Sequence, residues 1–268
     1  MKLGVLQFNP VHKNVNANYK VIEEYLKGVE DCIIVLPELC TTGYLFERKE
    51  ELYDLAEEIP NGNLTYILMS LAKKNNLLIV AGVAEKDDKK LYNSAVVISP
   101  DGFIGKYRKI NLFYKENLIF ERGERLDVFQ VNFLNQNIML GIMICFDWFF
   151  PEIARKLKLM GANIIAHPSN LVLPYCPKAM PIRALENKLY TITANRIGIE
   201  HSENDTLKFI GQSVICSPKA EYLMILSEED YGVFSVETDL KIEHEITKFN
   251  NFQEDIEKLY KQLPFLGF

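Results

Sequence analysis

Short, uninterrupted apolar runs constrain the fold of this chain more than any other feature of its sequence. Three of them are Cys32–Leu36, Leu77–Gly82 and Ile138–Ile144. A strand that is covered on both faces is apolar at every position, whereas a strand with one face in water alternates. Between the runs, residues 22–29 and 64–71 carry apolar side chains at the spacing of an amphipathic helix. This alternation predicts an α/β fold whose strands are buried on both sides.

The pattern changes after residue 85, where antiparallel hairpins are expected. Strands are predicted at Leu91–Ser99 and Phe103–Tyr107, joined by the tight turn Pro100–Gly102. A later helix is predicted at Pro181–Lys188. Two mixed sheets packed together, with helices outside, account for so many strands that are apolar on both faces. Because the 268 residues contain no repeat or linker, we expect one domain over residues 1–268.

Composition and charge argue against several classes of partner. The net charge of −6 disfavours nucleic acid or an anionic membrane surface as the main partner. No apolar stretch reaches the roughly 18 residues of a membrane span. Met1–Val5 leads directly into a strand pattern, so no signal peptide is expected. The five cysteines include no C-x-x-C pair, so we expect reduced thiols and a cytoplasmic protein.

The histidines lack the spacing of a metal site. All four (12, 167, 201 and 244) are far apart, so no metal is expected. His167 follows an apolar strand and can be either the base of a Cys–His pair or a buried imidazole with satisfied hydrogen bonds. We favour the second interpretation, because Glu38 and Lys109 offer a complete alternative. The chain also lacks G-x-S-x-G, P-loop and G-x-G-x-x-G motifs.

Cys145 is the strongest candidate nucleophile. It follows the apolar run that ends at Ile144, and Pro151 shortly afterwards is suited to the first position of a helix. Because a helix N-terminus favours an anion, we expect the thiol to ionise more easily than a free cysteine. The thiolate is the nucleophilic form. The alternative is an inert cysteine in the core.

Glu38 is a candidate general base. It follows the buried run Cys32–Leu36, and ligand crevices in α/β folds form where strands end. A carboxylate there can turn out to solvent or cap the loop Cys40–Gly43, which is the commoner case. The functional interpretation is a base whose pKa is raised by burial and which takes the proton from a thiol.

Lys109 is a candidate for stabilising negative charge. It belongs to a run of basic and phenolic residues, Lys106–Ile110, and such runs usually face solvent. Strand alternation, however, places Tyr107 and Lys109 on the opposite side from Lys106 and Arg108. An inward ammonium must pair with a carboxylate to be tolerated. It can then stabilise a developing oxyanion.

Three segments carry these candidates with their flanking residues, and two more follow. They are Leu36–Tyr44, Tyr107–Phe113, Gly141–Glu152, Arg183–Asn187 and Asn195–Gly198. In this order they resemble the nitrilase superfamily of carbon–nitrogen hydrolases, and the resemblance covers nearly the whole chain. It implies a four-layer αββα sandwich, a Glu–Lys–Cys triad and no metal or organic cofactor.

The resemblance also implies roles for individual residues. The triad would be Glu38, Lys109 and Cys145. A second glutamate, which family members often carry before a glycine, is assigned to Glu116, with Glu121 as the weaker candidate. The implied reaction passes through a thioester, with the oxyanion held by the lysine and by the backbone N–H that follows the nucleophile.

Substrate contacts are expected around the nucleophile. The backbone N–H of Phe146 completes the oxyanion site, and Tyr44 and Asn170 are further candidates for substrate binding. Family members that bind N-carbamoyl amino acids place arginines where this chain has Trp148 and Phe149. We expect these two aromatic residues to contact the substrate and to form a pocket for a small, uncharged or aliphatic group. We therefore predict hydrolysis of a small aliphatic amide or an N-carbamoyl amine.

Several alternatives stay open at this stage. Phe146–Asp147 is typical of the amidase side of the family, whereas residues 144–152 and 167–187 resemble an archaeal aliphatic nitrilase. The chain can thus be an aliphatic nitrilase, which converts a nitrile to its acid and ammonia. A non-catalytic binding scaffold of the same fold is another alternative. An acyltransferase, or an ammonia source for a partner, is a third.

A homodimer or larger homo-oligomer is expected, because the family usually forms dimers through helices beside the active site. The small-molecule substrate is the other expected partner. The C-terminal residues 256–268 are unusually apolar for a chain end. They can dock on their own domain or on a partner subunit, and the sequence favours neither.

Overall fold

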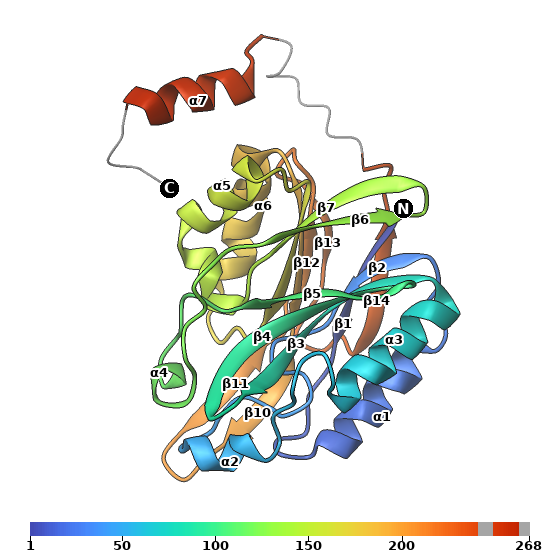
Figure 1. The fold of residues 1–268 in the computed structure, drawn as a ribbon, viewed down its shortest axis with the longest axis vertical. Helices are drawn as coiled ribbons and strands as arrows, with labels where there is room; N and C mark the ends of the chain where they lie inside the picture. The colour runs from blue at the N-terminus through green and yellow to red at the C-terminus, as the bar shows by residue number, and fades with distance from the viewer. Residues whose placement is uncertain (241–248, 263–268) are drawn as a thin grey trace.

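The fold consists of two mixed β-sheets packed face to face, with helices on the outer faces (Figure 1). The computed structural model describes residues 1–240 and 249–262. The arrangement is the four-layer αββα sandwich predicted above. The uninterrupted apolar runs form central strands of both sheets, where neither face meets water.

The first sheet contains β1 (Lys2–Gln7), β2 (Cys32–Val35), β3 (Leu77–Asp87), β4 (Lys90–Ser99), β5 (Gly102–Arg108) and β14 (Gly232–Glu237). Their spatial order is β14-β1-β2-β3-β4-β5. β1, β2 and β3 are parallel, and β3, β4 and β5 form the predicted antiparallel meander. Because β5 runs in the same direction as β2, the carboxyl ends of both strands lie at one edge. This edge brings residues 38 and 109 together.

The second sheet contains β6 (Val128–Phe133), β7 (Gln136–Ile142), β8 (Ile164–Ser169), β9 (Tyr190–Asn195), β12 (Val214–Cys216) and β13 (Tyr222–Ile225). Their spatial order is β13-β12-β9-β8-β7-β6. β7, β8 and β9 are parallel, so the residues that follow β7 and β8 also share an edge. β8 and β9 contact β1, β2 and β3 of the first sheet.

Two pairs of helices cover the sheets (Figure 1): α1 (Val15–Leu26) and α3 (Asn63–Asn75) on the first, α5 (Pro151–Leu159) and α6 (Tyr175–Asn187) on the second. The short strand β2 shows why both of its faces are apolar. Ile33 and Val35 belong to the core between the sheets, whereas Cys32 and Ile34 pack in the core beneath α1 and α3.

The predicted first residue of α6 was wrong. The helix begins at Tyr175 and not at Pro181, which lies inside it. A proline in a helix cannot donate to the carbonyl four residues earlier, which is that of Pro177. The Tyr222 hydroxyl in β13 donates to this carbonyl at 3.0 Å and so replaces the missing bond. A partner so distant in sequence cannot be read from the local pattern.

Several short elements had no sequence signal: α2 (Lys49–Tyr53), α4 (Glu116–Ile119), the 3₁₀ helix η1 (Cys145–Phe149) and the hairpin β10 (Ile197–His201) with β11 (Thr206–Ile210). None of the three helices in this list exceeds 5 residues, which is too short for a clear helical period.

The C-terminal helix α7 (Phe252–Gln262) contacts its own chain. The Nζ atom of Lys188, just after α6, lies 4.2 Å from the ring centre of Phe252, and Ile256 is buried. Docking on the same chain therefore accounts for this part of the predicted apolar terminus. Its last segment, Leu263–Phe268, lies outside the described residues. Within residues 1–240 and 249–262, no helix combines the length and apolar character needed to span a bilayer.

Candidate active site

Glu38 lies just beyond β2 and is completely buried. Gly82 of the neighbouring strand β3 leaves room for the Glu38 backbone, because a Cβ at position 82 would lie 2.4 Å from the Glu38 Cα. The Gly82 N–H donates to the Pro37 carbonyl at 3.1 Å, and its carbonyl accepts from the Cys40 N–H at 3.0 Å. The backbone on both sides of Glu38 is therefore held by β3.

Lys109 lies just beyond β5 and is also completely buried. Its Nζ donates to Oε1 of Glu38 and to Oε1 of Glu116, each at 2.7 Å. Asn93 of β4 contacts both residues. Its backbone carbonyl accepts from the Lys109 backbone N–H at 2.8 Å, and its side-chain Nδ2 donates to Glu38 Oε1 at 2.6 Å. The expectation that Lys109 points inward and pairs with a carboxylate is met by this geometry.

Glu116, at the start of α4, is the glutamate that reaches Lys109. Its Oε1 also accepts from the Tyr44 hydroxyl at 2.7 Å. Glu121, the weaker candidate, is half-exposed, with its carboxylate 3.8 Å from Lys49. The loop closes back on the lysine through Gly123, whose N–H donates to the Lys109 carbonyl at 2.8 Å.

Cys145 is the first residue of η1 and is buried, with an unusual positive φ of 42°. This left-handed conformation is costly for a residue with a Cβ and is concentrated at functional sites. α5 begins only at Pro151, so the thiol is not at the helix N-terminus as expected. The backbone N–H of Asn170, just beyond β8, favours the thiolate and so acts to lower the thiol pKa.

The electrostatics of the site follow mainly from burial. Burial raises the pKa of the Glu38 carboxyl and outweighs the attraction of Lys109. It opposes the Lys109 ammonium, but the charges of Glu116 and Glu38 outweigh this effect, so the pKa of Lys109 is raised. Burial, followed by the charge of Glu38, raises the pKa of the Cys145 thiol well above its ordinary value. The predicted lowering of the thiol pKa was therefore wrong, because burial disfavours the thiolate.

A cavity of about 200 Å³ opens above Cys145. It is lined mainly by aromatic and aliphatic side chains and contains no charged side chain: Phe113, Cys145, Phe146, Trp148, Phe149, Asn170, Leu171, Val172, Leu173 and Tyr175. Four of the five predicted substrate-binding residues thus line one cavity. The fifth, Tyr44, does not line this cavity, and its hydroxyl donates to Glu116 Oε1.

Several buried polar atoms at this site have no protein partner. They are Oε2 of Glu38, Oε2 of Glu116, Oδ1 of Asn93, and both side-chain polar atoms of Asn170. Buried polar groups are nearly always hydrogen-bonded, and exceptions deserve a functional explanation. The two carboxylate oxygens are acceptors, and the Asn170 amide offers both a donor and an acceptor.

His167 is accounted for by its own hydrogen bonds. It is completely buried, with Nε2 2.9 Å from the Cys145 carbonyl oxygen and Nδ1 3.0 Å from the Thr193 hydroxyl. Burial lowers its pKa to about 4, so the ring is neutral near pH 7. A neutral ring whose N–H donates to this carbonyl has its remaining nitrogen occupied by Thr193. This geometry supports the buried imidazole and not a Cys–His pair.

Two supporting features were given no role in the sequence analysis, although Arg196 lies in one of the segments that resemble the family. One is Asn93 of β4, whose side chain reaches Glu38 and whose carbonyl reaches the Lys109 backbone. The other is the buried pair Arg196–Glu200, whose carboxylate Oε2 accepts from the Tyr44 N–H and the Leu45 N–H, each at 2.9 Å. Both depend on contacts between segments that are distant in the chain.

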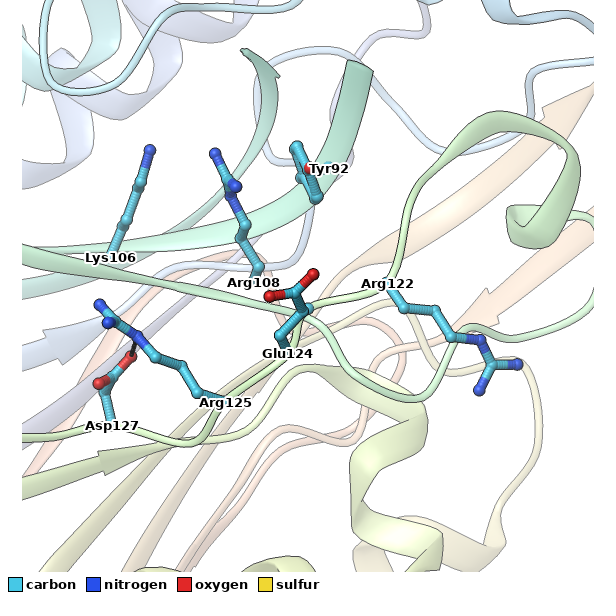
Figure 2. Close-up of a pocket in the computed structure, with 8 residues that line it drawn as sticks. Tyr92, Lys106, Arg108, Arg122, Glu124, Arg125 and Asp127 are labelled. Atoms are coloured by element: carbon cyan, nitrogen blue, oxygen red, sulfur yellow. Dashed lines mark hydrogen bonds and ion pairs between the residues drawn. The ribbon is translucent and has the colours of Figure 1, made fainter.

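A second cavity, of about 290 Å³, lies on the other face of β5 (Figure 2). Its charged side chains largely pair with acids, since Lys106 and Arg108 both bind buried Glu85. Figure 2 shows Arg125 paired with Asp127, at 3.1 Å. This cavity confirms the predicted strand alternation and contains none of the candidate catalytic groups.

No group of three or more histidine, cysteine, aspartate or glutamate side chains among the described residues is arranged to hold a metal ion.

Comparison with known proteins defines the family. The carbon–nitrogen hydrolase family model matches residues 2–245. A nitrilase from Pyrococcus abyssi is 49% identical over 266 residues, which cover 97% of this chain and 98% of that protein. An omega-amidase from Xenopus tropicalis is 30% identical, with 91% of each chain covered. A carbon–nitrogen hydrolase structure from Helicobacter pylori superposes with a TM-score of 0.77 at 25% identity, covering 99% of this chain and 94% of that one.

The chain therefore belongs to the carbon–nitrogen hydrolase family, within the nitrilase superfamily. This membership confirms the resemblance drawn from the sequence motifs. It also confirms that the chain is a hydrolase of carbon–nitrogen bonds, and it disfavours the non-catalytic scaffold.

The pH profile of kcat/KM is expected to reflect the raised pKa of Glu38. A general base must be ionised in the free enzyme, so activity should fall as the pH drops through this value. We expect the midpoint of the acid limb to lie above pH 4.5, the ordinary value for a glutamate. Circular dichroism at each pH would verify that the enzyme remains folded. A limb centred at or below pH 4.5 would contradict the assignment.

Proposed function

We propose that the protein is a cysteine-nucleophile hydrolase that cleaves the non-peptide carbon–nitrogen bond of a small aliphatic amide or an N-carbamoyl amine. The observation that carries the proposal is the buried ammonium of Lys109, bonded to Glu38 and Glu116 next to Cys145. Burying three charges is costly unless the geometry is well satisfied. Their position beside Cys145, whose backbone is in a strained left-handed conformation, favours a catalytic explanation over a structural one.

In the acylation step, Glu38 takes the proton from Cys145 and the thiolate attacks the carbonyl carbon. Lys109 and the backbone N–H of Phe146 stabilise the negative charge that develops on oxygen. The carbon–nitrogen bond then breaks, and the leaving nitrogen takes the proton from Glu38. Ammonia or an amine departs, and the acyl group remains on sulfur as a thioester.

In the deacylation step, Glu38 takes a proton from water, and the resulting hydroxide attacks the thioester. The carbon–sulfur bond breaks, the acid is released, and the proton held by Glu38 returns to the Cys145 sulfur. Glu116 orients the substrate amide and holds Lys109 in place. The unpartnered Oε2 atom of Glu38 supports its role as the base, because this oxygen is free to accept a proton.

The unpartnered oxygens also favour an amide over a nitrile. A primary amide brings two N–H donors, which match Oε2 of Glu38 and Oε2 of Glu116. A nitrile nitrogen brings none. The uncharged cavity lining favours a small apolar acyl group and offers no cation for a substrate carboxylate.

Aliphatic nitrile hydrolysis is the second candidate. The observation that favours it is the 49% identity to the protein named a nitrilase in Pyrococcus abyssi. The same thiolate would attack the nitrile carbon, and two waters would be consumed on the way to the acid and ammonia.

We further propose a single catalytic domain, a cytoplasmic location and a homodimer or larger assembly. The five cysteines are all free thiols, which supports a reducing compartment. Leu173, Tyr175 and Ile182, in or just before α6, expose large apolar side chains beside the site. Such a grouping supports an interface with a second copy.

Ammonia release tests the proposed reaction. We expect the wild type to release ammonia from small aliphatic amides or carbamoyl amines, and Cys145→Ala to lose at least about 10³-fold in rate while staying folded. Cys32→Ala is the matched control, because it removes another buried thiol, under α1 and α3. Release from dinitriles alone would support the nitrilase instead. Near wild-type activity in Cys145→Ala would refute the nucleophile.

Sedimentation velocity tests the assembly. At micromolar concentration the active protein should sediment as a species of at least twice the chain mass of 30.9 kDa. Ile182→Asp should weaken association, because it places a charge in the apolar surface of α6. Tyr66→Asp, on the exposed face of α3, is the control and should not. An active species of 30.9 kDa would contradict the proposal.

A further inference from the structure

Asp147 is a completely buried carboxylate whose two oxygens are both fully used. Its Oδ2 accepts from the Ile144 N–H at 2.9 Å and from the Tyr107 hydroxyl at 2.8 Å. Its Oδ1 accepts from the backbone N–H and the side-chain Nδ2 of Asn111, each at 3.0 Å. Four donors therefore converge on one side chain that does not line the substrate cavity.

These donors flank the two reactive residues. Tyr107 and Asn111 lie two positions before and two positions after Lys109. Ile144 directly precedes Cys145. A single carboxylate thus connects the lysine segment of the first sheet to the nucleophile segment of the second.

The same carboxylate closes a tight loop around Cys145. The Asp147 side chain accepts from the Ile144 N–H, and the Asp147 N–H donates to the Ile144 carbonyl at 3.1 Å. The two residues between them include Cys145 in its left-handed conformation. A strained backbone conformation of this kind is maintained only where several surrounding contacts hold it in place.

We propose that Asp147 is a positioning residue that holds the strained Cys145 at a fixed place relative to Lys109. The proposal rests on the nucleophilic role of Cys145. Asp147 acts through the backbone of both segments and does not touch the reacting atoms. Asparagine cannot replace it, because it offers one acceptor oxygen where two are used and turns an NH₂ group toward donors.

The test compares Asp147→Asn with Asp127→Asn, which removes an aspartate from the outer cavity that binds Arg125. The rate of Cys145 alkylation by iodoacetamide is measured at one pH, with the modified peptide identified by mass spectrometry. We expect alkylation to slow about tenfold or more in Asp147→Asn. With an amide substrate, kcat should fall about 100-fold while KM changes less than about threefold, because misplacement of reacting groups affects the chemical step. Asp127→Asn should behave as wild type.

Tyr107→Phe keeps the ring and removes one of the four donors to Asp147. It tests the proposal if Asp147→Asn does not fold. We expect it to slow alkylation several-fold without unfolding. Wild-type alkylation and kcat in folded Asp147→Asn, or in Tyr107→Phe, would overturn the proposal. A purely structural role would lower only the melting temperature. Because alkylation needs no substrate, this outcome is distinct from failure of the proposed hydrolysis.

Discussion

The buried ammonium of Lys109 between Glu38 and Glu116 is the interaction on which the site depends. Both bonds are 2.7 Å long, and all three side chains are removed from water. Removing one partner of a buried ion pair typically costs about 3–5 kcal/mol, because the remaining charge stays buried. Here the loss of Lys109 would leave two carboxylates facing one another. The ammonium therefore holds these buried charges together. It also opposes the rise in the Glu38 pKa that burial causes, and so favours the ionised base beside a thiol that is itself hard to ionise.

The fold supplies this meeting point through the direction of its strands. Glu38 and Lys109 follow β2 and β5 of one sheet, and Cys145 and Asn170 follow β7 and β8 of the other. Glu38, Lys109 and Cys145 are buried at these strand ends. The apolar cavity opens above the thiol, and charge–charge interactions beneath it are stronger than at a surface.

The sequence predicted the layers, and the candidate residues it named are ones that the structure brings together. Uninterrupted apolar runs identify strands buried on both sides, and period-two alternation showed that Lys109 can point inward while Lys106 and Arg108 face the other way. The misses have non-local causes. The start of α6 depends on Tyr222 replacing a bond that Pro181 cannot make. The thiol pKa depends on the depth of burial, and the position of Asn93 depends on sheet register; no short segment encodes either.

The most direct test of this account is the rate at which iodoacetamide alkylates Cys145 in the wild type and in Glu38→Gln at pH 7. The account predicts that a buried thiol with a raised pKa reacts only with the help of Glu38, so the variant should react at least about 100-fold more slowly. Glu58→Gln, an exposed glutamate away from the site, should react like the wild type. Alkylation of Glu38→Gln at the wild-type rate would show that Cys145 ionises without Glu38 and would contradict the account.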